Sequence, residues 1–127
     1  AVLQAAGRLA LGRLGARVVG VTGATGKTTT QDILVAMLRA AGVAAEGTPG
    51  NRNTESGVPM SLMGLSEGCA VAVVEMGMRG AGQIAELARL APPEVGCITA
   101  IAPVHLELVG TVEGVAAAKA ELLEALR

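Results

Sequence analysis

The chain contains no phenylalanine, tryptophan or tyrosine, and its formal net charge is only -1. Without aromatic rings it lacks the stacking platforms that hold single-stranded bases and the interfacial anchors of membrane proteins. Its near-neutral charge gives no electrostatic reason to bind nucleic acid or an anionic membrane. No apolar run reaches the roughly 18 to 20 residues of a membrane span, and no cleavable signal pattern opens the chain. We therefore expect a cytoplasmic monomer with no nucleic-acid or membrane partner.

Cysteine is scarce as well, with only two residues in 127. Cys69 and Cys97 are each predicted to lie in a buried strand, where a free thiol behaves as a small apolar group. We expect both to be free, with a disulfide as the alternative if the two strands are neighbours. The chain starts without methionine and stops inside a helical pattern. We therefore expect a fragment of a longer protein. Its length predicts a single domain that can bury a hydrophobic core.

The strongest motif lies where a β-branched run meets a glycine-rich turn that leads into a helical pattern. Glycines in such a loop let backbone N–H groups face a phosphate, and the helix N-terminus adds partial positive charge. Lys27 would reach the β- and γ-phosphates, and the Thr28 hydroxyl would hold Mg²⁺. The usual spacing requires glycine at Val21, so this is a shortened loop, and a simple tight turn is the alternative. The candidate ATP- and phosphate-binding residues are Gly23, Ala24, Thr25, Gly26, Lys27, Thr28 and Thr29.

Hydrophobic periodicity predicts helices that alternate with short apolar strands. Strands that are apolar on both faces are typical of a parallel sheet covered by helices on both sides. We therefore predict an α/β fold, a partial three-layer sandwich like that of phosphate-loop NTPases. The second helix is expected to bury Ile33, Leu34, Met37 and Leu38. The expected helices are 2–14, 28–41, 55–66, 82–91 and 112–126, and the expected strands are 17–21, 43–46, 69–75 and 95–101.

Two further candidate residues follow predicted strands. Ligands of such sheets lie at the carboxyl ends of the strands, so Glu75 and His105 would meet the phosphate loop there. A carboxylate at Glu75 suits a hard cation held at Thr28. The alternatives are an acid that merely ends a strand and a surface histidine.

The last predicted helix carries a lysine on its apolar stripe. Val115, Lys119 and Leu122 follow helical spacing, which places Lys119 on the face expected to be buried. Such a lysine either extends its ammonium group to solvent or faces a cleft that holds a partner. Both possibilities remain open from the pattern.

Several motifs in order resemble the Mur ligases, the ATP-dependent amide ligases of peptidoglycan precursor synthesis. The segment 22–29 resembles that family's shortened phosphate loop, although asparagine commonly stands at the position of Thr25. The segment 50–59 resembles a Gly-Asn-x-Asn-Asn-Glu-x-Gly-Val-Pro motif, with Thr54 departing from asparagine. Further matching segments are 75–80, 82–84, 103–107, 110, 113–116 and 118–121.

This resemblance implies an ATP- and Mg²⁺-dependent, ADP-forming ligase. It would phosphorylate the carboxylate of UDP-MurNAc-tripeptide, and the amine of D-alanyl-D-alanine would then attack the acyl phosphate. Residues 1–16 would be the tail of the N-terminal domain, and residues 17–127 the first part of the central ATP-binding domain. This fragment alone would be inactive.

The resemblance also implies roles for single residues. Lys27, Glu75, His105 and Lys119 would be catalytic, and Thr28, Glu75, His105 and carbamylated Lys119 would hold metal. Asn51 and Asn53 would lie on the substrate side. The alternatives are a folylpolyglutamate- or cyanophycin-type ligase, against which the segment 51–59 argues, and a nucleotide-binding module without activity.

Overall fold

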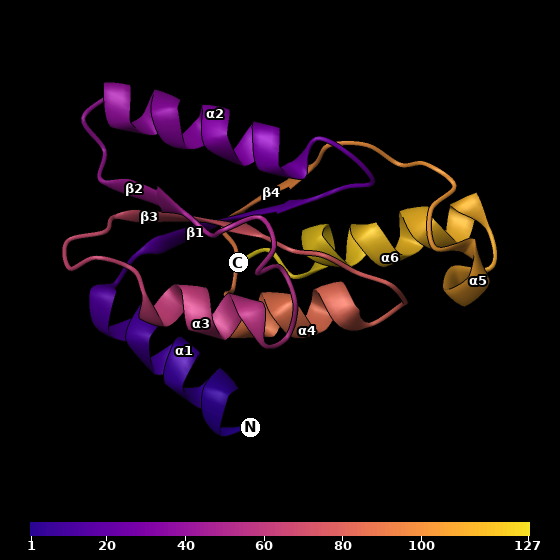
Figure 1. The fold of residues 1–127 in the computed structure, drawn as a ribbon, viewed down its shortest axis with the longest axis horizontal. Helices are drawn as coiled ribbons and strands as arrows, with labels where there is room; N and C mark the ends of the chain where they lie inside the picture. The colour runs from indigo at the N-terminus through magenta and orange to yellow at the C-terminus, as the bar shows by residue number, and fades with distance from the viewer.

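The computed structural model describes residues 1–127 as alternating helices and strands (Figure 1). Every predicted element is present, with ends that shift by a few residues, and one short helix, α5, was not predicted. The elements are α1 (Val2–Leu14), β1 (Arg17–Thr22), α2 (Lys27–Ala40), β2 (Ala45–Gly47), α3 (Gly57–Met63), β3 (Val71–Glu75), α4 (Gln83–Leu90), β4 (Val95–Ile98), α5 (Leu106–Val109) and α6 (Val112–Glu124).

The four strands form one parallel sheet in the order β2-β3-β1-β4. Strand β1 is central, and its Val21 is in register with Glu75 of β3 and Cys97 of β4. The carboxyl ends of these three strands therefore lie at the same edge of the sheet. The segments that follow them are the phosphate loop, the 76–82 loop and the 99–105 loop.

Helices cover both faces of the sheet, as predicted. Helix α2 lies on one face, and α3, α4 and α6 lie on the other, with α1 packed outside α3 (Figure 1). The larger core cluster, of 16 residues, joins the sheet to α3, α4 and α6 through side chains such as Val74, Ile84 and Leu122. The smaller cluster, of four residues, lies under α2. The protein is thus a three-layer α/β sandwich.

The prediction of which α2 residues are buried is wrong in part. Ile33 and Met37 are 56% and 64% exposed, whereas Gln31 and Val35 are buried. The helix is rotated because the amide group of Gln31 is bonded at the end of β2, where Gln31 Nε2 donates to Thr48 O at 2.6 Å. A hydrogen-bonded glutamine can occupy a buried position that an apolar pattern assigns to other residues.

Both cysteines are free, as expected. Cys69 precedes β3, which begins at Val71, and Cys97 lies in β4. Strand β1 separates β3 from β4, so the condition for the alternative disulfide is not met. None of the helices combines the length and the apolar character that crossing a membrane requires.

Candidate functional site

The glycine-rich loop after β1 is held by the loop after β4. Gly23 has φ 152°, and a Cβ there would lie 1.9 Å from the hydroxyl oxygen of Thr99, so the approach requires glycine. Thr99 Oγ1 donates to Thr25 O at 2.5 Å, and Ala24 N donates to Ala100 O at 2.9 Å. Strand β4 ends at Ile98, three residues before its predicted end, because residues 99 and 100 turn to hold this loop.

Helix α2 begins directly at the lysine of the motif. Its N-cap is Gly26, in the left-handed region at φ 81°, and Lys27 is the first helical residue. The Lys27 ammonium group folds back and donates to Gly23 O at 2.8 Å. Unpaired N–H groups in the first turn of a helix favour anions. The loop therefore combines a cation with a helix N-terminus, which suits a phosphate.

The Thr28 hydroxyl, the Asn53 amide and the Glu75 carboxylate form a connected group, which we call the Thr28 wall. Thr28 Oγ1 donates to Glu75 Oε2 at 2.9 Å, and Asn53 Nδ2 donates to Glu75 Oε1 at 3.1 Å. Two oxygens that bind an octahedral Mg²⁺ at right angles, each about 2.0–2.1 Å from the ion, are themselves about 3 Å apart. The spacing and chemistry of the Thr28 and Glu75 oxygens therefore fit a magnesium ion.

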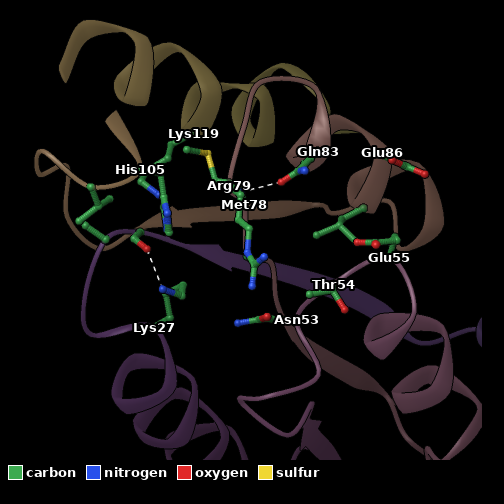
Figure 2. Close-up of a pocket in the computed structure, with 15 residues that line it drawn as sticks. Lys27, Asn53, Thr54, Glu55, Met78, Arg79, Gln83, Glu86, His105 and Lys119 are labelled. Carbon is green, nitrogen blue, oxygen red and sulfur yellow. Dashed lines mark hydrogen bonds between the residues drawn. The ribbon is translucent and has the colours of Figure 1, made fainter. Parts of the chain in front are cut away.

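Beside this wall lies a cavity of about 590 Å³ lined by 15 residues (Figure 2). The cations Lys27, Arg79 and Lys119 outnumber the acids Glu55 and Glu86 in its lining. Figure 2 shows the Arg79 side chain reaching into the space between Lys27 and Asn53. An excess of cations in a concave site favours an anionic ligand.

The other wall is formed by Lys119 and His105, and we call it the Lys119 wall. Lys119 is 2% exposed, which confirms that it lies on the buried stripe of α6. Burial, and secondarily the charge of Lys27, lowers the pKa of the Lys119 ammonium group. His105 is the only non-glycine residue with positive φ, at 55°, and it caps the short helix α5. Figure 2 shows both side chains on the same side of the cavity.

The structure brings most of the sequence-predicted residues together. Gly23, Ala24, Lys27, Asn53, His105 and Lys119 line the cavity, and Thr28 and Glu75 adjoin it through Asn53. Thr25 and Gly26 complete the loop and Thr29 lies in the first turn of α2, while Asn51 is exposed and does not line the cavity. No three side chains of the His, Cys, Asp or Glu types are grouped to hold a metal ion.

Sequence reasoning missed several residues that shape this site. Arg79 lines the cavity, and Gln31 and Thr48 support Glu75 from behind. Glu121 of α6 accepts hydrogen bonds from Gly82 N at 2.7 Å and Ala85 N at 3.0 Å. It thereby ties α6 to the N-terminus of α4. Only the position of Arg79 soon after a strand end offered a signal in the sequence.

The chain resembles known proteins over nearly its whole length. Residues 21–127 match the family model described as the Mur ligase middle domain. The chain is 41% identical over 125 residues to UDP-N-acetylmuramoyl-tripeptide--D-alanyl-D-alanine ligase of Bacillus subtilis, covering 98% of the chain and 27% of that protein. It is 46% identical over 106 residues to the ligase of the same name from Synechocystis, covering 84% of the chain and 23% of that protein.

The fold agrees with these similarities. The crystal structure of MurF ligase from Thermotoga maritima in complex with ADP has a TM-score of 0.91 and 38% identity, covering 99% of this chain and 29% of that one. The chain spans about a quarter of the length of the curated relatives. The family model covers the phosphate loop, the Thr28 wall and the Lys119 wall. The chain therefore belongs to the Mur ligase family, and its residues 21–127 match that family's middle domain.

Proposed function

We propose that the protein containing this chain is an ATP-dependent, ADP-forming ligase of peptidoglycan precursor synthesis. It would join D-alanyl-D-alanine to UDP-MurNAc-tripeptide, the reaction named for the Bacillus subtilis and Synechocystis relatives. The observation that carries the proposal is the meeting of Lys27, the Thr28 wall and Lys119 around one cation-rich cavity. We place the reaction in the cytoplasm and expect the enzyme to be a monomer.

The proposal divides the chain into two parts. Residues 1–16, which include α1, would be the tail of a preceding domain, and residues 17–127 the first part of the ATP-binding domain. Helix α1 packs against α3, and its Leu11 joins the larger core cluster, so this tail would dock firmly on the domain that follows.

Each wall has a task in this reaction. ATP with Mg²⁺ would supply the transferable phosphoryl group and neutralise its charge. Lys27 and the first turn of α2 would bind the phosphates, and Thr28 and Glu75 would hold the metal. Arg79 and Asn53 face the part of the cavity where the acceptor carboxylate would approach. Cations there would reduce the repulsion between that carboxylate and the γ-phosphate.

Lys119 would act as a carbamate. Its lowered pKa increases the fraction of neutral amine relative to an ordinary lysine, and the Nζ of that amine can bond to the carbon of CO₂ and release a proton. The product is an anion that, with His105, could hold a second metal ion. Because no three acidic or histidine side chains are grouped for a metal, this wall would depend on the carbamate and on substrate oxygens for its remaining ligands.

The test is phosphate release by the full-length protein with ATP, Mg²⁺, UDP-MurNAc-tripeptide and D-alanyl-D-alanine. We expect release to require all four, and the chain 1–127 alone to form no product because the site must close to exclude water. Release driven instead by folyl-glutamate or a cyanophycin primer would indicate one of the alternative ligases. Nucleotide binding without turnover by the full-length protein would indicate a binding module.

A further inference from the structure

A buried amide and a buried hydroxyl are joined behind the Thr28 wall. Gln31 and Thr48 are 4% and 2% exposed. Gln31 Nε2 donates to Thr48 O at 2.6 Å, and Thr48 Oγ1 donates to Gln31 Oε1 at 3.2 Å. Thr48 Oγ1 also accepts from the backbone N–H of Glu75 at 3.0 Å. Both ends of the Gln31 amide are therefore bonded to one residue, which is itself bonded to Glu75.

These bonds connect the two elements that supply the candidate metal ligands. Gln31 lies three residues after Thr28 on α2, so the two side chains share a face of that helix. Glu75 is the last residue of β3. Neither Gln31 nor Thr48 lines the cavity. They are placed to act on Thr28 and Glu75 from behind, without touching a ligand.

The turn that follows Thr48 packs against the Thr28 hydroxyl and the Glu75 carboxylate. A Cβ at Gly50 would be 2.6 Å from Thr28 Oγ1 and 3.2 Å from Glu75 Oε2, so this backbone packs against both oxygens. Thr48 N donates to Val73 O at 3.0 Å and anchors the start of this turn on β3. A shift of Thr48 would therefore move the turn against the oxygens or away from them.

We propose that Gln31 and Thr48 are positioning residues that set the spacing of the Thr28 hydroxyl and the Glu75 carboxylate for metal-dependent nucleotide binding. The inference rests on the proposed function, since it assigns a support to the same site. Apolar contacts such as that of Val35 in the neighbouring core cluster would hold α2 on the sheet equally well. Directional hydrogen bonds also fix the position of α2 relative to β3, and therefore the distance between Thr28 and Glu75. This distance matters because Mg²⁺ demands near-ideal octahedral geometry.

The decisive variants are Thr48→Val, which keeps the shape but lacks the hydroxyl, and Gln31→Met, which keeps the length but lacks the amide. Thr48→Ser is the matched control, because it retains the hydroxyl. Affinity for a non-hydrolysable ATP analogue is measured by calorimetry on the full-length protein, with Mg²⁺ and with a chelator. Mn²⁺ binding in the presence of the analogue is measured by electron paramagnetic resonance.

We expect Thr48→Val and Gln31→Met to weaken metal-dependent binding about tenfold, the effect of one or two lost hydrogen bonds. Metal-free binding should stay within about twofold of the unsubstituted protein, and Thr48→Ser should behave as the unsubstituted protein does. Circular dichroism identifies a variant that fails to fold, and in that case the other variant decides.

Two results would overturn the inference alone. One is an equal loss of affinity with and without metal, which indicates a merely structural role. The other is unchanged metal dependence in both folded variants. By contrast, an unsubstituted full-length protein whose binding of the analogue needs no metal would overturn the proposed metal site, and the inference with it.

Discussion

The Thr28 wall and the Lys119 wall face the same cavity but differ in how fully their polar groups are paired. In the Thr28 wall each side chain is hydrogen-bonded, with Thr28 and Asn53 each donating to one oxygen of Glu75. In the Lys119 wall, neither Lys119 nor His105 takes part in an ion pair. Lys119 is nonetheless only 2% exposed as a residue, with its side chain in the cavity lining, and the backbone of His105 is in the left-handed region.

Only the Thr28 wall has its polar side chains paired before any ligand binds. The Thr28 wall is built on a strand end and a helix start, with its oxygens already spaced for a cation. The Lys119 wall combines a largely buried lysine that forms no ion pair with a loop residue in the left-handed region, and each of these has a cost in free energy. Such a cost persists where a ligand or a chemical modification later compensates.

The largest effect should come from Lys27, which lines the cavity that the two walls share. Lys27→Met removes the cation that meets the phosphates, and we expect ATP turnover by the full-length protein to fall about 10³-fold. The fold should persist, because the ammonium group bonds only to its own loop at Gly23 O. Phosphate release and circular dichroism check the two statements. Near-normal turnover in the folded variant would remove the phosphate-loop assignment.

The second-largest loss of turnover should come from Lys119→Arg, which tests whether Lys119 acts as a carbamate. Lys119→Arg keeps the positive charge, but guanidinium forms no carbamate and cannot act as an anionic metal ligand. We expect turnover to fall about 10²-fold or more. A crystal structure of the unsubstituted full-length protein at neutral or higher pH should show additional density on Lys119 Nζ. Close to parental turnover in the arginine variant would contradict the carbamate and leave an unmodified lysine.

Much of this fold could be predicted because local patterns decide it. The alternation of apolar strands and helices, and the glycines that end them, depend on neighbours in sequence. The ends of parallel strands gather at one edge, which is why Lys27, Glu75 and His105 could be predicted to meet. Lys119 was found because a charge on an apolar stripe violates the pattern of its own helix.

The residues that escaped prediction depend on contacts between distant segments. Gln31 is buried only because it bonds to Thr48, the residue after β2, and Thr99 shortens β4 only because it bonds to the phosphate loop. The exposure of Ile33 and Met37 follows from the same rotation of α2. The short helix α5 has too few residues for a periodic signal. These features depend on register and rotation, which periodicity leaves open.

A smaller effect should separate metal binding from phosphate binding in the Thr28 wall. Thr28→Val removes the hydroxyl that bonds to Glu75 Oε2, so we expect affinity for Mg²⁺ with an ATP analogue to fall about tenfold. Metal-free affinity should change much less, because Lys27 and the helix N-terminus remain. Calorimetry with and without Mg²⁺ measures both, and Thr30→Val on the same helix is the control. Equal losses in the two conditions would contradict a metal role for Thr28.

The smallest effect concerns stability and follows from the pKa of Lys119. Burial lowers this pKa below the ordinary lysine value, so the folded state disfavours the ammonium form. Below the lowered pKa, the buried charge therefore reduces the free energy of unfolding. As pH rises through the lowered pKa towards the ordinary one, the folded state releases its proton first, and stability increases.

Lys119→Met should accordingly stabilise the unmodified 127-residue chain at neutral pH, because it removes the buried charge and keeps an apolar side chain of similar length. The advantage of the variant should shrink between about pH 7 and about pH 10, as the parent's Lys119 becomes neutral in the folded state. Arg89→Met, which removes an exposed cation from α4, is the control and should change stability by less than about 0.5 kcal/mol at either pH. Urea unfolding at both pH values measures the difference. A constant difference between parent and Lys119→Met would show that the ammonium group reaches solvent, and the contrast between the two walls would then lose its electrostatic basis.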